Sequence, residues 1–298
     1  MLKLKNQLLQ LFSKTPGAKS AEAEIDLILF HVFKKADPTL HNFSDLRIAS
    51  PTASSEMISE AVALATERLK GRPLQHVLGN QFFFDHDYQV DPSTLIPRPE
   101  TEILVSLAIQ RITSLKNHAP FRFAELGLGT GIISCELLAA FPFAQGVASE
   151  LNPQAIELSK KNLTTVLGPD WSSRFIIKPA RDSTQGFETF QEDSPFDFVI
   201  SNPPYVSKFD EIEAEVMNHE PKRALFPEIS GTLDAPNYFY ENFLMHPEIL
   251  APGGYAFFEI PHERSLDLRE TFESYGFQTE LHPDLTGRFR VLIASRHN

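Results

Sequence analysis

The sequence predicts an α/β protein with a Rossmann-like, doubly wound and mostly parallel sheet, preceded by a small helical domain and a short β-hairpin linker. The first 70 residues carry helical periodicity and no obvious strands. After Pro120, short apolar or β-branched runs of strand length alternate with helical stretches. A glycine-rich turn joins the first of these runs directly to a helix. Alternating strands and helices favour a parallel sheet with helices on both faces.

The composition limits the kind of protein this can be. The 298 residues include 39 acidic and 27 basic side chains, a formal net charge of −12, and 42% of the residues are hydrophobic. That hydrophobic content is enough for packed cores, and the acidic balance disfavours nucleic-acid binding through a general electrostatic field. No apolar stretch approaches the roughly 18 residues that a membrane span needs. We therefore expect a cytoplasmic monomer with no direct nucleic-acid or membrane partner.

No metal site is expected from the cysteines or histidines. Cys135 is the single cysteine, which excludes an intramolecular disulfide and a site with several cysteine ligands. It lies among apolar helix residues, so we predict a buried packing thiol rather than a nucleophile. No i, i+4 metal-binding pair occurs among His86, His219, His246, His262 and His282.

Helical patterns dominate the N-terminal part of the chain. Apolar residues in 21–36 form one helical stripe, and a second stripe in 54–71 has a possible N-cap serine and ends near a glycine. We expect a loop around Asp37–Thr52 between them. Alternating aromatic residues in 81–92 suggest a hairpin. The expected boundaries are 1–75 for the helical domain, 76–95 for the hairpin linker and 96–298 for the sheet domain.

Six runs of strand length predict the sheet. They are FRFAEL (121–126), QGVASE (145–150), RFIIKPA (174–180), FDFVISN (196–202), GGYAFFEI (253–260) and FRVLIASR (289–296). Helical stretches separate them, with apolar periodicity in GIISCELLAAF, NPQAIELSKKNL, NYFYENFLMHPEIL and SLDLRETFESYG.

The first strand ends in a glycine-rich turn, Glu125–Gly131, that leads into a helix. A strand, glycine turn and helix bring bare backbone and a helix N-terminus against a ligand. The spacing is G-x-G-x-G, unlike the dinucleotide fingerprint, and Glu125 adds negative charge where a pyrophosphate would lie. A ligand with positive charge, such as S-adenosylmethionine, fits better. Glu150 ends the second strand, where a carboxylate can accept both ribose hydroxyls.

The fourth strand ends in a second turn, Asn202-Pro203-Pro204-Tyr205. The prolines remove two backbone donors and leave carbonyls that can only accept hydrogen bonds. Asn202 adds a side-chain acceptor, and Tyr205 offers a ring face for a planar group. Acceptors that converge on a planar NH₂ group suit a substrate amide or exocyclic amine, which would gain mainly from orientation.

The two turns and Glu150 resemble those of class I, S-adenosylmethionine-dependent amino-methyltransferases. From Gly71 to its end, the chain resembles the release factor glutamine methyltransferases, the HemK/PrmC family. The segments that carry this resemblance are GRPLQHVLGNQFFF (71–84), LIPRPETEILV (95–105), EPKRALF (220–226) and DLTGRFRVL (284–292). The family's glycine-rich GG-x-DG run is lacking in PEISGTLDAPNYFY (227–240).

The resemblance implies methyl transfer from S-adenosylmethionine, which leaves S-adenosylhomocysteine, to the amide nitrogen (N5) of the glutamine in the Gly-Gly-Gln motif of peptide chain release factors. It implies a class I methyltransferase domain at 96–298 and a substrate-recognition role for the helical domain. Asn202, Pro203, Pro204 and Tyr205 would be the catalytic residues, and Arg98 would be structural or line the pocket. The implied cofactor-binding residues are Glu125, Gly127, Leu128, Gly129, Thr130, Gly131, Glu150, Asp182, Ser183 and Asn202.

Three other readings stay open at this point. Enzymes that methylate an exocyclic amine of a nucleic-acid base carry similar turns after the fourth strand, although they usually need a basic binding face. A ribosomal-protein glutamine is another possible acceptor. The third reading is a non-catalytic binding module on a methyltransferase fold, which the intact glycine turn, Glu150 and Asn202 disfavour.

Overall fold

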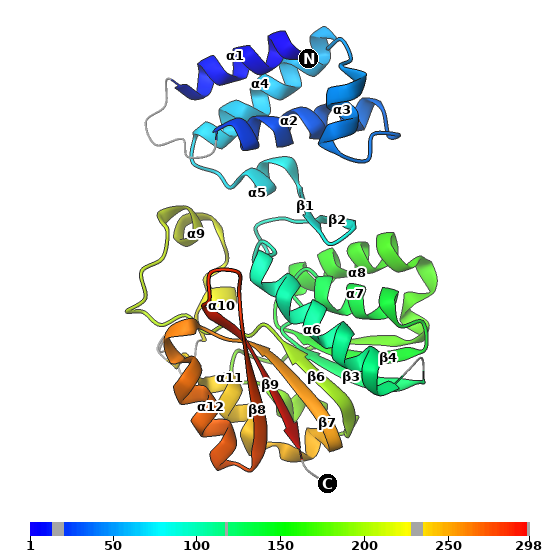
Figure 1. Ribbon diagram of the computed structural model, residues 1–298, viewed down its shortest axis with the longest axis vertical. Coiled ribbons are helices and arrows are strands. Elements are labelled where there is room, and N and C mark those ends of the chain that lie inside the picture. Colours follow the sequence, from blue (N-terminus) through cyan, green and yellow to red (C-terminus); the bar gives the residue numbers. More distant parts are fainter. Residues whose placement is uncertain (14–20, 117–118, 228–234, 297–298) are drawn as a thin grey trace. The chain divides into compact units, whose positions relative to one another are not determined.

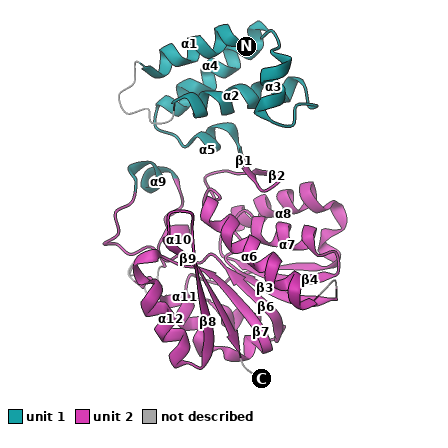
Figure 2. Ribbon diagram, in the orientation of Figure 1, with its two compact units in different colours: residues 1–80, 213–219 teal, residues 81–212, 220–298 magenta. Residues whose placement is uncertain are grey.

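The computed structural model describes residues 1–13, 21–116, 119–227 and 235–296, and these form two compact units (Figure 2). The helical unit comprises Met1–Asn80 together with Glu213–His219. The sheet unit comprises Gln81–Ile212 and Glu220–Asn298. The short segment of the helical unit that lies between two strands of the sheet unit in sequence was not expected from the sequence.

In the helical unit, α1 (Leu2–Ser13), α2 (Ala21–Ala36) and α4 (Ser55–Leu69) are amphipathic and each buries apolar residues on one face. In α2, the predicted stripe is the buried one, and the two acidic residues of its first turn and two basic residues of its last turn favour the helix dipole. The α4 helix starts where predicted, because the Ser54 side chain accepts from Met57 N. The helices are α1 (Leu2–Ser13), α2 (Ala21–Ala36), α3 (Phe43–Ala49), α4 (Ser55–Leu69), α5 (Leu74–Leu78) and α9 (Ala214–His219).

The expected loop at Asp37–Thr52 is partly wrong, because it contains α3. A capping box starts this helix: Asn42 accepts from Asp45 N, and the Asp45 side chain accepts from Asn42 N. Leu46 is buried and ties the short helix to the core of the unit. The many Ser, Thr and Pro residues around the helix hid this signal.

The sheet unit holds one seven-stranded sheet in the order β5-β4-β3-β6-β7-β9-β8 (Figure 1). The first five strands in this order pair in parallel, and β9 runs antiparallel to both neighbours. The strands are β3 (Phe121–Leu126), β4 (Ala144–Glu150), β5 (Phe175–Pro179), β6 (Phe196–Ser201), β7 (Leu250–Glu259), β8 (Phe277–Pro283) and β9 (Phe289–Arg296). The predicted doubly wound, mostly parallel fold is confirmed.

The hairpin expected in 81–92 is also present, as β1 (Asn80–Phe83) and β2 (His86–Gln89). The α-helices of the sheet unit are α6 (Pro99–Lys116), α7 (Ile132–Ala140), α8 (Pro153–Leu167), α10 (Lys222–Leu225), α11 (Tyr238–Met245) and α12 (Ser265–Ser274). The short 3₁₀ segments are η1 (Pro169–Ser173), η2 (Phe187–Phe190), η3 (Pro247–Ile249) and η4 (His262–Arg264).

Two hydrophobic cores cover the two faces of the sheet. Side chains alternate along β3, so Phe121 and Phe123 pack with α6, α7 and α8, whereas Ala124 and Leu126 pack with α11 and α12. Cys135 is fully buried in the first core, as predicted, and burial raises the pKa of its thiol. Helices on both faces leave the ends of the strands as the accessible edge of the sheet.

Within the described ranges, no helix is long and apolar enough to cross a membrane. The segment in which the family's GG-x-DG run is lacking falls mostly in 228–234, outside the described residues.

Candidate active site

The two predicted turns start from neighbouring strands. The strand order reverses between β3 and β6, which makes their carboxyl ends the switch point of the sheet, where open α/β folds bind ligands. In register, Leu126 pairs with Ser201, so the glycine turn and the Asn202 turn begin side by side. A cavity of about 530 Å³ opens at this edge, a volume typical of small-molecule sites.

Most predicted site residues line this one cavity. From the cofactor set these are Glu125, Gly127, Leu128, Gly129, Thr130, Glu150, Asp182, Ser183 and Asn202, and from the catalytic set Asn202, Pro203 and Pro204. Gly131 and Tyr205 do not line it. The structure adds residues that sequence patterns did not single out, among them Thr101, Phe239 and the basic pair Lys222 and Arg223.

The glycine turn and Glu150 hold each other. Gly129 N donates to Glu150 Oε2 at 2.8 Å, and Asn152 N donates to Oε1 at 2.8 Å. Gly127 and Gly129 have φ values of +77° and +54°, a backbone region that glycine adopts most readily. The Glu150 carboxylate is therefore fixed at the cavity wall, at the end of β4, by backbone donors from both sides.

Glu125 is the buried acid of the site. Its side chain is 0% exposed, accepts from the Ser134 hydroxyl of α7, and leaves Oε1 without a hydrogen-bond partner. Burial raises the pKa of Glu125 to about 8, and the neighbouring Glu150 charge adds to this effect. An unpaired buried carboxyl oxygen at a cavity wall is suited to a cationic ligand group.

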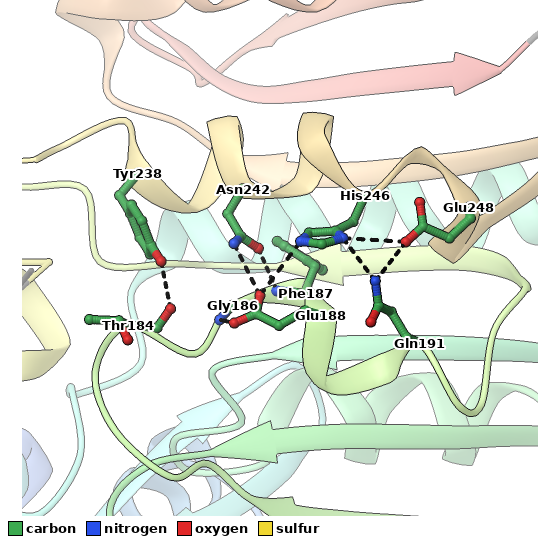
Figure 3. A network of polar contacts seen from close by, with 9 residues as sticks. All are labelled: Thr184, Gly186, Phe187, Glu188, Gln191, Tyr238, Asn242, His246 and Glu248. Atoms are coloured by element: carbon green, nitrogen blue, oxygen red, sulfur yellow. Dashed lines mark hydrogen bonds and ion pairs between the residues drawn. The ribbon is translucent and has the colours of Figure 1, made fainter.

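Asp182 and Ser183 line the cavity from the loop that follows β5. Side chains of α11 bond the backbone that follows them in sequence (Figure 3). Asn242 accepts from Phe187 N at 2.6 Å and donates to Glu188 at 3.0 Å. The Tyr238 hydroxyl donates to the Thr184 carbonyl at 2.5 Å. At the other end of the network, Gln191, His246 and Glu248 join one another. The wall that carries Asp182 and Ser183 is thus anchored to a helix of the second core.

The Asn202 side chain is hydrogen-bonded to Thr101, which is in turn hydrogen-bonded to Glu259. Asn202 Nδ2 donates to Thr101 Oγ1 at 3.2 Å, and Thr101 Oγ1 donates to Glu259 Oε2 at 2.7 Å. The Tyr205 hydroxyl donates to the other Glu259 oxygen at 3.1 Å. Tyr205 therefore points its hydroxyl at a buried carboxyl, and the ring face expected to stack on a ligand is not among the cavity walls.

Arg98, which lines the cavity, forms an ion pair with the buried Glu220. Arg98 Nη2 lies 2.5 Å from Glu220 Oε1, and Ile96 N donates to Glu220 Oε2 at 3.0 Å. The Glu220 side chain is 1% exposed. Both segments that resemble the family, IPRPETE and EPKRALF, meet at this pair, which gives Arg98 a structural role as well as a place in the cavity wall.

Comparison with known proteins decides the family. Residues 108–227 match the model of the methyltransferase small domain. The chain is 31% identical to the release factor glutamine methyltransferase of Flavobacterium psychrophilum over 301 residues, which cover 97% of this chain and 96% of that protein. The chain belongs to the release factor glutamine methyltransferase family. The predicted family is thereby confirmed.

Other similar proteins are consistent with this family assignment. The release factor glutamine methyltransferase of Vibrio cholerae is 29% identical over 282 residues, 93% of this chain and 90% of that protein. Among solved structures, the delta-N METTL16 MTase domain aligns with a TM-score of 0.50 at 18% identity, covering 71% of this chain and 88% of that one. At that identity the likeness supports the methyltransferase fold only.

Membership of a methyltransferase family implies S-adenosylmethionine as the methyl donor. The cavity of this protein fits that cofactor. The unpaired Glu125 Oε1 can accept from a cationic amino group. Gly127 and Gly129 present backbone without side chains beside it. Within the described residues, no three His, Cys, Asp or Glu side chains cluster as metal ligands would.

Proposed function

We propose that this protein transfers the methyl group of S-adenosylmethionine to the side-chain amide nitrogen (N5) of the glutamine in the Gly-Gly-Gln motif of peptide chain release factors. The observation that carries this proposal is the meeting of two turns at one cavity. One turn offers acids and bare backbone to a cationic cofactor, and the other offers only hydrogen-bond acceptors to a planar NH₂ group.

The cofactor residues divide by chemistry. Glu150, fixed by Gly129 N, has lone pairs left to accept the ribose hydroxyls. Glu125 accepts the amino group of the methionine part. Asp182 and Ser183 flank the adenine, on the loop that α11 anchors. When bound, S-adenosylmethionine supplies an electrophilic methyl group on a sulfonium.

The residues after β6 orient the nucleophile. The Asn202 side-chain oxygen and the Pro203 carbonyl accept the two N–H bonds of the substrate amide, so that its nitrogen lone pair points at the methyl carbon. With the cofactor bound, the amide nitrogen would form the new N–C bond as the S–C bond breaks, and it would then lose one proton to solvent. Pro204 lines the same cavity, and no general base is required.

We propose that the helical unit recognises the body of the release factor. A single glutamine side chain gives the cavity little with which to choose a protein, so selection needs a further surface. The α9 segment supports this assignment. It belongs to the helical unit although its sequence follows the Asn202 turn, and its Glu215 lies 2.7 Å from Arg68 of α4.

The test is a transfer assay with methyl-labelled S-adenosylmethionine. The purified protein meets a release factor, the same factor with its Gly-Gly-Gln glutamine changed to alanine, a ribosomal-protein fraction, and bulk RNA and DNA. We expect label on the intact factor alone, mapped to that glutamine. Label in nucleic acid or in a ribosomal protein would replace the proposed substrate, and no label anywhere despite cofactor binding would contradict the proposed function.

A further inference from the structure

The residues behind Asn202 come from elements that the cofactor and substrate roles do not use. Thr101 lies near the start of α6, and Glu259 is the last residue of β7. Glu259 is 2% exposed and does not line the cavity. Its two oxygens are both occupied, by the Thr101 and Tyr205 hydroxyls. Burying a carboxyl group costs free energy because the group loses its hydration. The position of Glu259, hydrogen-bonded to Thr101 of the cavity wall, therefore requires an explanation.

The direction of the hydrogen bonds that run from Asn202 through Thr101 to Glu259 explains what this carboxyl does. An ionised carboxylate can only accept hydrogen bonds, so the Thr101 hydroxyl gives its single proton to Glu259. The hydroxyl oxygen then has only lone pairs to offer Asn202, which must present its NH₂ end there. The Asn202 carbonyl oxygen is consequently the end that remains for the cavity. If the amide were reversed, an NH₂ group would face the substrate and could not accept its N–H bonds.

We infer that Thr101 and Glu259 are positioning residues, which fix the Asn202 amide with its carbonyl oxygen available to the substrate amide. This inference rests on the proposed function, because it assigns Asn202 the acceptor role described there. Orientation of a reacting group is a large part of what such a site can contribute, and a displacement of about 1 Å can cost roughly 100-fold in rate.

The surroundings of Glu259 support a switchable polarity. Burial raises the pKa of Glu259 to about 7, against the lowering effect of its two hydroxyl donors. A protonated Glu259 can itself donate to Thr101, so the direction of the hydrogen bonds between Asn202, Thr101 and Glu259 is then no longer fixed. The charged and titratable groups that face it from the elements packed against it are Glu100 on α6, Tyr205 after β6, Tyr240 on α11 and Arg290 on β9.

The first experiment replaces the hydroxyl in the intact protein. With a release factor as substrate, Thr101→Val should lower kcat by about 10- to 100-fold and leave the Kd for S-adenosylmethionine within about twofold. Thr101→Ser keeps the hydroxyl and should stay within about threefold of wild type. Thr165→Val is the matched control, because that exposed hydroxyl only bonds its own helix carbonyl on α8. Wild-type kcat in Thr101→Val would overturn the inference, as would equal losses in the Ser and Val variants.

The second experiment asks whether Glu259 acts through Thr101. Glu259→Gln should lower kcat to a similar extent, and the double variant Thr101→Val/Glu259→Gln should lose little more than Thr101→Val alone. Losses that multiply would show that the two residues act independently, which would overturn the inference that Glu259 acts through Thr101. Glu270→Gln on the exposed face of α12 is the control for the charge change.

A readout without turnover separates this inference from the proposed function. In wild type, the Asn202 side-chain NH₂ protons should exchange slowly with solvent, and Thr101→Val should speed their exchange at least tenfold by NMR. Unchanged exchange would overturn the positioning of Asn202 even in an active enzyme. If the wild type fails to label a release factor but the exchange result holds, the proposed substrate is wrong and the orientation of Asn202 stands.

Discussion

Ser201 at the end of β6 donates its hydroxyl proton to the carbonyl of Leu126 at the end of β3, at 2.8 Å. The same two residues are register partners in the sheet. The hydrogen bond is buried, and it links the two strands at the point where both functional turns begin. Gly127 lies close enough to the second turn that a Cβ built on it would be 4.0 Å from the Asn202 carbonyl oxygen. The residues that lead into the two turns are therefore joined both by the sheet register and by this side-chain hydrogen bond.

Replacing Asn202 by alanine tests the substrate turn. Asn202→Ala should lower kcat by roughly 1,000-fold, because an acceptor for the substrate amide is lost, and should leave the Kd for S-adenosylmethionine within a few fold. Transfer to a release factor and calorimetric titration of the cofactor measure the two effects. An equal loss of turnover and cofactor affinity would show that Asn202 serves the cofactor instead.

Replacing Glu150 by alanine tests the cofactor turn. The carboxylate is held by Gly129 N and Asn152 N, so its loss removes both the ribose acceptor and a support of the glycine turn. Glu150→Ala should raise the Kd for S-adenosylmethionine by about 10- to 100-fold, while kcat at saturating cofactor falls much less. Glu157→Gln on the exposed side of α8 is a suitable control. A normal Kd in Glu150→Ala would remove Glu150 from the cofactor site.

Much of the fold and site could be predicted from local patterns. The two turns were recognisable because each follows a buried apolar strand and carries residues whose backbone chemistry is unusual. The β8 strand was missed, because its alternate residues Gln278, Glu280 and His282 are polar at the edge of the sheet and weaken the apolar signal. The α3 helix was missed because Asn42 and Asp45 also suit a loop.

The support behind the site could not be predicted for a different reason. Thr101 and Glu259 are 158 positions apart in the chain, and nothing in either local pattern indicates the other. Their contact depends on β7 lying beside β6 and on α6 packing near its end, which only the folded sheet shows. Pairs of this kind need three-dimensional information.

The rate should depend on pH through Glu259. Its pKa is raised to about 7, and the ionised carboxylate is the form that sets the polarity of the Thr101 chain. We therefore expect kcat to fall as the pH falls through about 7, once cofactor is saturating. Glu259→Gln has no such group and should give a flatter profile at a lower rate. A wild-type profile that is flat from pH 6 to 8 would contradict this prediction.

Stability should also depend on pH through Glu125. Its pKa is about 8 in the folded protein and near its ordinary value of 4.5 when unfolded, so the unfolded chain ionises first. The contribution of Glu125 to stability is complete below about pH 4.5 and is lost as the pH rises towards 8. Calorimetry of the sheet unit's transition between pH 5 and 8 should show a smaller decline in Tm for Glu125→Gln than for wild type. Identical declines would show that Glu125 is already ionised in the folded protein.

Two glycines with nearly equal positive φ values allow the effect of backbone strain to be separated from the effect of crowding. Gly131 is the N-cap residue of α7 and has φ +81°, and a Cβ built on it would lie 3.0 Å from the Cβ of Ser159 on α8. Gly276 follows α12 at φ +85°, and a Cβ there would meet nothing within 4 Å. The predicted cofactor role of Gly131 can therefore be tested against a packing role, since Gly131 does not line the cavity.

Gly276→Ala should destabilise the protein by about 1 kcal/mol, because a left-handed conformation is unfavourable for alanine. Gly131→Ala carries the same strain, and the forced shift of α7 against α8 should add about 1–3 kcal/mol. Thermal or urea unfolding measures both losses. If they are equal, α8 yields to the added methyl group. Gly131→Ala could instead weaken cofactor binding while its loss of stability is no greater than that of Gly276→Ala. That result would show that Gly131 supports the glycine-rich turn, and the packing explanation would be wrong.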